Sequence, residues 1–199
     1  MKTRHFAAAA TVLGLLLPVV VGADEGAEAP KAQYIGVEAC GKCHKRDSTG
    51  NQLAKWQEAK HSKAYATLAS PEALKLAKER GIADPQKDGS CLKCHVTAYG
   101  VDPSLIPPAP EGKKGFVVED GVQCESCHGA GSLYKKRKVM KDREASVAAG
   151  MLIPDEKVCT QCHNEESPSF KAFNYEEMRK KTEHPNPKRL AEKEGTTGG

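Results

Sequence analysis

The sequence predicts a mainly α-helical fold made of short helices and long loops. The chain of 199 residues contains 12 prolines and 18 glycines, which interrupt long stretches of regular structure. Only 5% of the residues are aromatic and 28% are charged, so side chains alone supply little material for an apolar core. All eight cysteines occur in four copies of one short motif. We therefore expect something other than side chains to fill the interior.

The repeated motif is Cys-x-x-Cys-His. Its four copies comprise Cys40, Cys43 and His44; Cys91, Cys94 and His95; Cys124, Cys127 and His128; and Cys159, Cys162 and His163. Two thiols at this spacing can form thioethers with the two vinyl groups of a haem, and the adjacent histidine can ligate the iron. The sequence therefore predicts four covalently bound c-type haems.

Three other interpretations of the cysteines compete with this one. Paired cysteines also occur in zinc knuckles, in redox-active dithiols and in the disulfides of secreted proteins. None of these requires a histidine directly after the second cysteine, and all four pairs have one with no cysteine left over. Haems would also supply the missing core, so we expect the chain without haem to be largely unfolded.

The N-terminus has the pattern of a secretory signal peptide. Lys2 and Arg4 precede an apolar stretch at 6–21, and small residues follow at Gly22 and Ala23. An uncleaved anchor is the alternative, but this stretch is short for a span of about 20 residues and contains a proline. The sequence therefore predicts cleavage, no membrane span afterwards, and a periplasmic or extracellular location.

The predicted organisation is a signal peptide at 1–23, a flexible lead at 24–36, one tetrahaem domain at 37–186 and a disordered tail at 187–199. Within the domain, we expect helices at 51–69, 71–80 and 175–182 and a short strand at 116–118. Cleavage would remove two of the 30 basic residues and leave 28 against 26 acidic residues. This balance gives no reason to expect a nucleic-acid partner.

The number of histidines limits how many irons can have two histidine ligands. There are seven histidines, of which four belong to the motifs and His5 lies in the signal peptide. Only His61 and His184 remain, so at most two haems can have a second histidine ligand. The alternatives are an exposed His61 on a lysine-rich helix and a His184 that belongs to the tail.

Several strings resemble one known family of cytochromes. They are WQEAKHSKAY after the first motif, CHVTAYG at the second, GVQCESCHGAGS at the third, and CHN, SPSF and EHP near the C-terminus. Over residues 35–186, the chain is similar to the tetrahaem cytochrome c-554-type family, which accepts electrons from hydroxylamine oxidoreductase, and to its multihaem relatives.

The resemblance implies a mostly helical fold with closely stacked haems. It implies that His61 is the second ligand of the haem on His163, that His184 is that of the haem on His128, and that the haem on His95 is five-coordinate. Family members have a further histidine after the third motif that caps the first haem, and this sequence has none there. Tyr134 is near the expected place, and Lys135, Lys138 and Met140 are the other possible metal ligands.

These residues favour an electron carrier that works between two protein redox partners. A haem with an open face could instead make the protein a small enzyme acting on nitric oxide or hydroxylamine, although no set of catalytic residues is evident. The carboxylates nearest to a motif are Glu119, Asp120 and Glu125. A third possibility is a subunit of a larger multihaem assembly.

Overall fold

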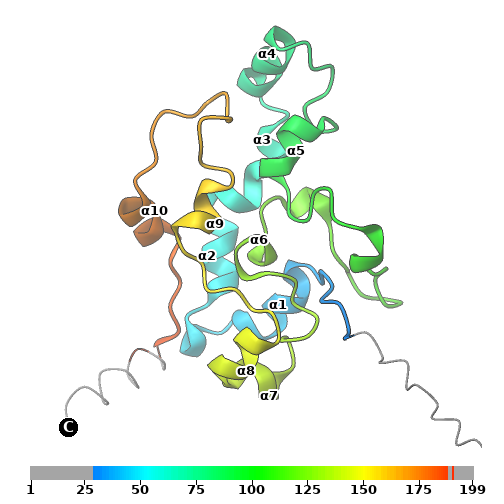
Figure 1. Ribbon diagram of the computed structural model, residues 1–199, viewed down its shortest axis with the longest axis vertical. Helices are drawn as coiled ribbons and strands as arrows, with labels where there is room; N and C mark the ends of the chain where they lie inside the picture. Colours follow the sequence, from blue (N-terminus) through cyan, green and yellow to red (C-terminus); the bar gives the residue numbers. More distant parts are fainter. Residues whose placement is uncertain (1–28, 188–189, 191–199) are drawn as a thin grey trace, which may run out of the picture. The chain divides into compact units, whose positions relative to one another are not determined.

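The computed structural model (Figure 1) describes residues 29–187 and residue 190, and this part of the chain is helical and contains no strand. The first half contains α1 (Val37–His44), η1 (Asp47–Thr49), α2 (Gln52–Glu58), η2 (Lys60–Lys63), α3 (Ala64–Thr67), α4 (Pro71–Glu79) and α5 (Gly89–His95). The second half contains η3 (Pro103–Leu105), η4 (Val118–Asp120), α6 (Cys124–His128), α7 (Arg137–Lys141), α8 (Arg143–Ala148), α9 (Glu156–Thr160) and α10 (Tyr175–Thr182). The prediction of a mainly α-helical fold is confirmed.

Parts of the predicted organisation lie outside the described residues. These parts are the whole signal peptide, the first five residues of the lead, and all of the tail except residues 187 and 190. The end of the lead lies within the described residues, and hydrogen bonds join it to distant parts of the chain. The Tyr34 amide donates to the Leu105 carbonyl at 2.8 Å, and the Gln33 amide donates to Ser132 Oγ at 2.7 Å. Over the described range, no helix has the length and apolarity needed to cross a membrane.

The helix expected at 51–69 is broken into three pieces, α2, η2 and α3. Ala59 adopts an extended conformation with φ −71° and ψ 153°, which ends α2. The hydroxyl of Ser62 then lies 2.9 Å from the Ala59 carbonyl and 3.1 Å from that of Gln57, so it satisfies carbonyls that the end of α2 leaves free. The prediction of one continuous helix is therefore wrong, and His61 lies in the 3-10 turn between two helices.

Two other predicted helices are confirmed. Ser70 caps α4 by accepting a hydrogen bond from the Ala73 amide at 3.2 Å, and Pro71 occupies the first helical position. Gly81, with φ +72°, follows the end of α4. The third helix, α10, covers 175–182 as predicted and is capped by the Asn174 side chain.

The short strand expected at 116–118 is absent, and this prediction is wrong. Val118 begins the 3-10 turn η4 instead. The carbonyl of Val117 accepts a hydrogen bond from the side-chain amide of Gln123 at 2.7 Å, a group that a strand would need for pairing. A side chain thus fixes this segment without a partner strand.

Few apolar side chains are buried. Among the described residues, the buried hydrophobic ones are Val37, Leu68, Ala77, Val96 and Tyr134. Leu152 and Ile153 remain 49% and 46% exposed, although Leu152 lies beside the third motif, where its carbonyl is 3.2 Å from His128 Nδ1. The polypeptide by itself therefore has only a small apolar core, in agreement with its composition.

Candidate functional site

The four Cys-x-x-Cys-His motifs lie at the ends of four short helices. Two of them form the C-terminal residues of α1 and α5, and the third makes up the whole of α6. The fourth begins in α9, and its histidine continues the turn, since the His163 amide donates to the Cys159 carbonyl at 3.0 Å. All eight cysteines lie in the described part of the chain as free thiols. Each helix end thus presents two thiols and an imidazole together.

Thiols of different motifs meet in space. The neighbouring Cys124 thiol and burial raise the pKa of Cys40. Burial and the neighbouring Cys94 thiol raise the pKa of Cys162 to about 12. The first and third motifs are therefore neighbours, and so are the second and fourth, although each pair is distant in sequence.

Three of the four motif histidines, His44, His95 and His128, are oriented by hydrogen bonds at Nδ1. Their acceptors are the Gln52 side-chain oxygen for His44 at 3.1 Å, the Ala64 carbonyl for His95 at 2.8 Å and the Leu152 carbonyl for His128 at 3.2 Å. These oxygens can only accept, so Nδ1 carries the proton and Nε2 keeps its lone pair. An imidazole held in this way is ready to bind a metal through Nε2.

Two motif histidines each face a second imidazole. The ring centroids of His61 and His163 are 6.1 Å apart with an interplanar angle of 72°, and those of His128 and His184 are 6.1 Å apart at 73°. Metal–imidazole bonds of about 2.0–2.1 Å on the two sides of one ion, plus the distance from each nitrogen to its ring centroid, add up to about 6 Å. Both pairs therefore have the spacing at which two imidazoles share one iron.

Burial favours the neutral form of three of these imidazoles. Burial lowers the pKa values of His61, His128 and His163, which favours the unprotonated form that binds metals. His163 also stacks on Phe173, with ring centroids 4.8 Å apart. In the described range, no three His, Cys, Asp or Glu side chains gather where they could hold one metal ion by themselves.

His184 is fixed by contacts on both sides. Its Nδ1 lies 2.8 Å from the Thr182 carbonyl, and the Gln52 side chain donates to the carbonyl of His184 at 3.4 Å. The same Gln52 holds the ring of His44. His184 therefore belongs to the folded domain, next to the first and third motifs.

No such partner ring faces His44 or His95 within the described residues. Tyr134, the predicted candidate near His44, is buried and lies close to Cys40. Its hydroxyl donates toward the carbonyls of Gly129 at 2.7 Å and His128 at 3.1 Å, and burial raises its pKa. A neutral phenol bound to carbonyls is poorly suited to ligate iron, so this geometry disfavours Tyr134. Lys135 and Lys138 are exposed, and Met140 is half-buried.

Sequence reasoning missed the role of Glu125, which it had considered only as a nearby carboxylate. Glu125 is 2% exposed and accepts hydrogen bonds from the amides of Ile35, Gly36 and Gly131, at 2.7–3.1 Å. Its pKa is raised because burial outweighs these three donors. Glu125 thus joins the third motif to the segment just before the first. The string GVQCESCHG contained this residue but gave no sign of its partners.

A second connection joins the third motif to the turn that carries His61. The Trp56 indole donates to the Val122 carbonyl at 2.8 Å, and the Val122 amide donates to the His61 carbonyl at 3.0 Å. Gly121 has φ +70°, and a Cβ there would lie 2.8 Å from the His61 carbonyl oxygen. Only glycine allows this close approach.

Comparisons with known proteins show similarity to one group of cytochromes. A family model described as "Cytochrome c554 and c-prime" matches residues 39–129, which include the first three motifs. A curated relative, "Cytochrome c-554" of Nitrosomonas europaea, is 28% identical over 173 residues, and the match covers 76% of this chain. The chain spans 65% of the length of that relative. No solved structure matches the sequence.

Proposed function

The chain belongs to the cytochrome c554 family, and from this premise we propose that it is a periplasmic tetrahaem cytochrome that transfers electrons between redox proteins. The family carries covalently bound c-type haem. When bound, such haem supplies reversible one-electron oxidation and reduction of its iron. The protein supplies attachment, axial ligands and spacing.

The residues that would hold the haems are those of the four motifs. The cysteine pairs Cys40 and Cys43, Cys91 and Cys94, Cys124 and Cys127, and Cys159 and Cys162 would form the thioethers. The adjacent histidines would ligate the irons through Nε2. His61 would be the second ligand opposite His163, and His184 would be the second ligand opposite His128.

The observation that carries the proposal is the spacing of the two histidine pairs, 6.1 Å in each case. An iron with an imidazole on each face is coordinatively closed, so it can accept and donate electrons without binding substrate. The contacts between thiols of neighbouring motifs support short distances between haems. Together these features favour electron transfer over chemistry at the iron.

The proposed location and partners rest on sequence patterns. The signal-peptide pattern at 1–23 supports export to the periplasm, where c-type cytochromes could meet donor and acceptor proteins. The donor and the acceptor would be proteins, because closed haems exchange electrons through their edges.

A second candidate function is binding or turnover of a small molecule such as nitric oxide. The observation that favours it is that neither His44 nor His95 faces another imidazole in the part of the chain that the structure describes. An iron with an open or weakly held face can bind such ligands. This activity would accompany electron transfer and would be confined to these two haems.

Electron paramagnetic resonance of the oxidised protein, with and without nitric oxide, tests both functions. We expect two low-spin haems that do not bind nitric oxide and at least one high-spin haem that binds it. His61→Ala should convert one low-spin signal to high-spin, whereas Lys60→Ala, at the exposed neighbouring position, should leave the spectrum unchanged. Four low-spin irons inert to nitric oxide would remove the second function, and a spectrum unchanged by His61→Ala would contradict the proposed ligation.

A further inference from the structure

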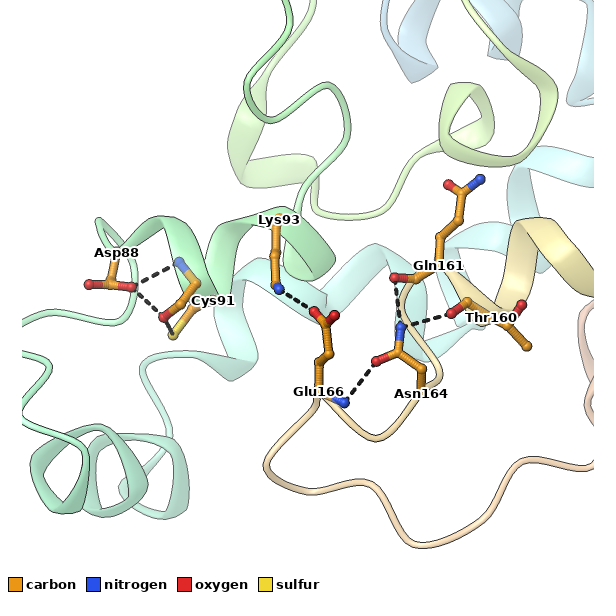
Figure 2. Close-up of polar contacts among 8 residues, drawn as sticks. Asp88, Cys91, Lys93, Thr160, Gln161, Asn164 and Glu166 are labelled. Atoms are coloured by element: carbon orange, nitrogen blue, oxygen red, sulfur yellow. Dashed lines mark hydrogen bonds and ion pairs between the residues drawn. The ribbon is translucent and has the colours of Figure 1, made fainter.

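An ion pair links the second and fourth motifs. Figure 2 shows Lys93, which lies between the two cysteines of the second motif, reaching Glu166, three residues after the fourth motif. The Lys93 Nζ and the nearer Glu166 carboxylate oxygen are 2.6 Å apart. Three further ion pairs in the described range join residues three or four positions apart, whereas this one joins residues 73 positions apart.

Both partners of this ion pair are held by their surroundings. The side-chain oxygen of Asn164 accepts a hydrogen bond from the Glu166 amide at 2.9 Å, and its Nδ2 donates to the carbonyls of Thr160 at 2.8 Å and Gln161 at 3.1 Å (Figure 2). These bonds fold the chain after α9 back toward α5. Lys93 is part of α5, whose first turn is capped by Asp88.

The ion pair lies at the point where the two motifs touch. The Cys94 and Cys162 thiols are neighbours, and Lys93 lies near both of them. If both thiols carry haem, the Lys93–Glu166 pair bridges the two attachment segments beside the sulfurs.

The ion pair contributes little to global stability. The side chains of Lys93 and Glu166 are 47% and 74% exposed, and exposed ion pairs contribute about 0–1 kcal/mol. Its effect must therefore be sought in local position. The segment after α9 carries His163 at its start, and α5 ends at His95, so a small shift between them would move one iron relative to the other.

We propose that Lys93 and Glu166 are positioning residues that fix the haem on His163 relative to the haem on His95. This inference rests on the proposed attachment of haem at the second and fourth motifs. Without the ion pair, the Asn164 hydrogen bonds would still fold the chain after α9, but the Glu166 side chain would no longer be tied to α5. The ligand geometry at His163 and the reduction potentials of the two haems would then change.

The test compares single and paired substitutions in the haem-loaded protein. Lys93→Gln, Glu166→Gln and the double substitution should all change the low-spin signal of the haem on His163 and shift the potentials in the same direction, because each one removes the same contact. Lys93→Arg keeps the ion pair, so this variant should have the same low-spin signal and the same reduction potentials as the parent protein. Shifts of opposite sign that cancel in the double variant would overturn the proposal, since they would show that the charges act without positioning. Unchanged signals and potentials would overturn it too.

The matched control is Lys87→Gln, which removes the Lys87–Asp84 ion pair of 2.8 Å in the loop before α5. It makes the same change of charge near the second motif but breaks no contact between motifs. It should therefore change neither the low-spin signal of the haem on His163 nor the reduction potentials. Mass spectrometry of peptides from the parent protein keeps the two hypotheses apart. Absence of haem from the second or fourth motif would refute the proposed function, whereas haem on both motifs with unaltered variants would refute only the positioning role.

Discussion

Glu125 connects the third motif to the segment before the first motif through hydrogen bonds. Its carboxylate accepts hydrogen bonds from three backbone amides, two of which precede the first motif and one of which follows the third. Removing a buried acceptor leaves such donors unsatisfied, at a cost of about 1–3 kcal/mol for each group that water does not reach. The carboxylate is therefore structural, and it has no free oxygen to act as an acid or base.

We expect Glu125→Ala to lower the free energy of unfolding of the haem-loaded protein by about 2–6 kcal/mol, because the two buried amides, those of Gly36 and Gly131, lose their acceptor. Chemical denaturation followed by circular dichroism measures the loss. Glu119→Gln, at an exposed position, serves as the control and should change the free energy by less than about 0.5 kcal/mol. Equal effects of the two substitutions would contradict the structural role of Glu125.

For single residues, the sequence predicts which cysteines and histidines form each motif. It does not predict which residues form hydrogen bonds between segments that are distant in the sequence. The cysteines and their histidines could be read from local spacing, because attachment requires that spacing. The partners of Glu125 lie about 90 residues away, at Ile35 and Gly36, and nothing in the sequence connects them. Tyr134 is a candidate from the sequence for the second ligand of the haem on His44, but the direction of its hydroxyl depends on backbone carbonyls that only the structure locates.

Among the elements, the short turn η2 depends most on its neighbours. It carries His61, and its backbone packs against Gly121, where a Cβ would lie 2.8 Å from the His61 carbonyl oxygen. The sequence pattern indicated helical periodicity across 51–69 but not the break at Ala59, because the break is fixed by Ser62 and by the distant third motif. The isolated helices α4 and α10 were predicted closely, since their caps are local residues.

Gly121→Ala tests how closely η2 and the third motif approach each other. Gly121 has φ +70° and ψ −135°, a conformation that strongly favours glycine. We expect the substitution to destabilise the protein by more than the roughly 1–3 kcal/mol of such backbone strain alone and to disturb the low-spin haem ligated by His61. Gly81→Ala is the matched control, because Gly81 has a similar φ of +72° and a Cβ added there would meet nothing within 4 Å. Gly81→Ala should lower the stability of the protein only through backbone strain at residue 81, and it should leave the haem spectrum unchanged. A haem spectrum unaffected by Gly121→Ala would show that the contact does not position His61.

Over the whole molecule, the polypeptide has too little apolar core to account for its own fold. The buried hydrophobic side chains of the described residues number five, and one of these is a tyrosine. Large apolar macrocycles held between the motif helices would supply the missing buried area. The composition indicated this shortage before the structure, but the pairing of motifs in space could not be read from the chain.

The central claim is that four haems are covalently attached to one chain, and the intact mass of the purified, denatured protein tests it most directly. Thioether-linked haem survives denaturation, whereas zinc or loosely bound cofactors are lost. We predict the mass of the polypeptide from about residue 24 onward plus four haem groups. A mass with fewer than four haems, or one that falls to that of the bare polypeptide on denaturation, would contradict the account.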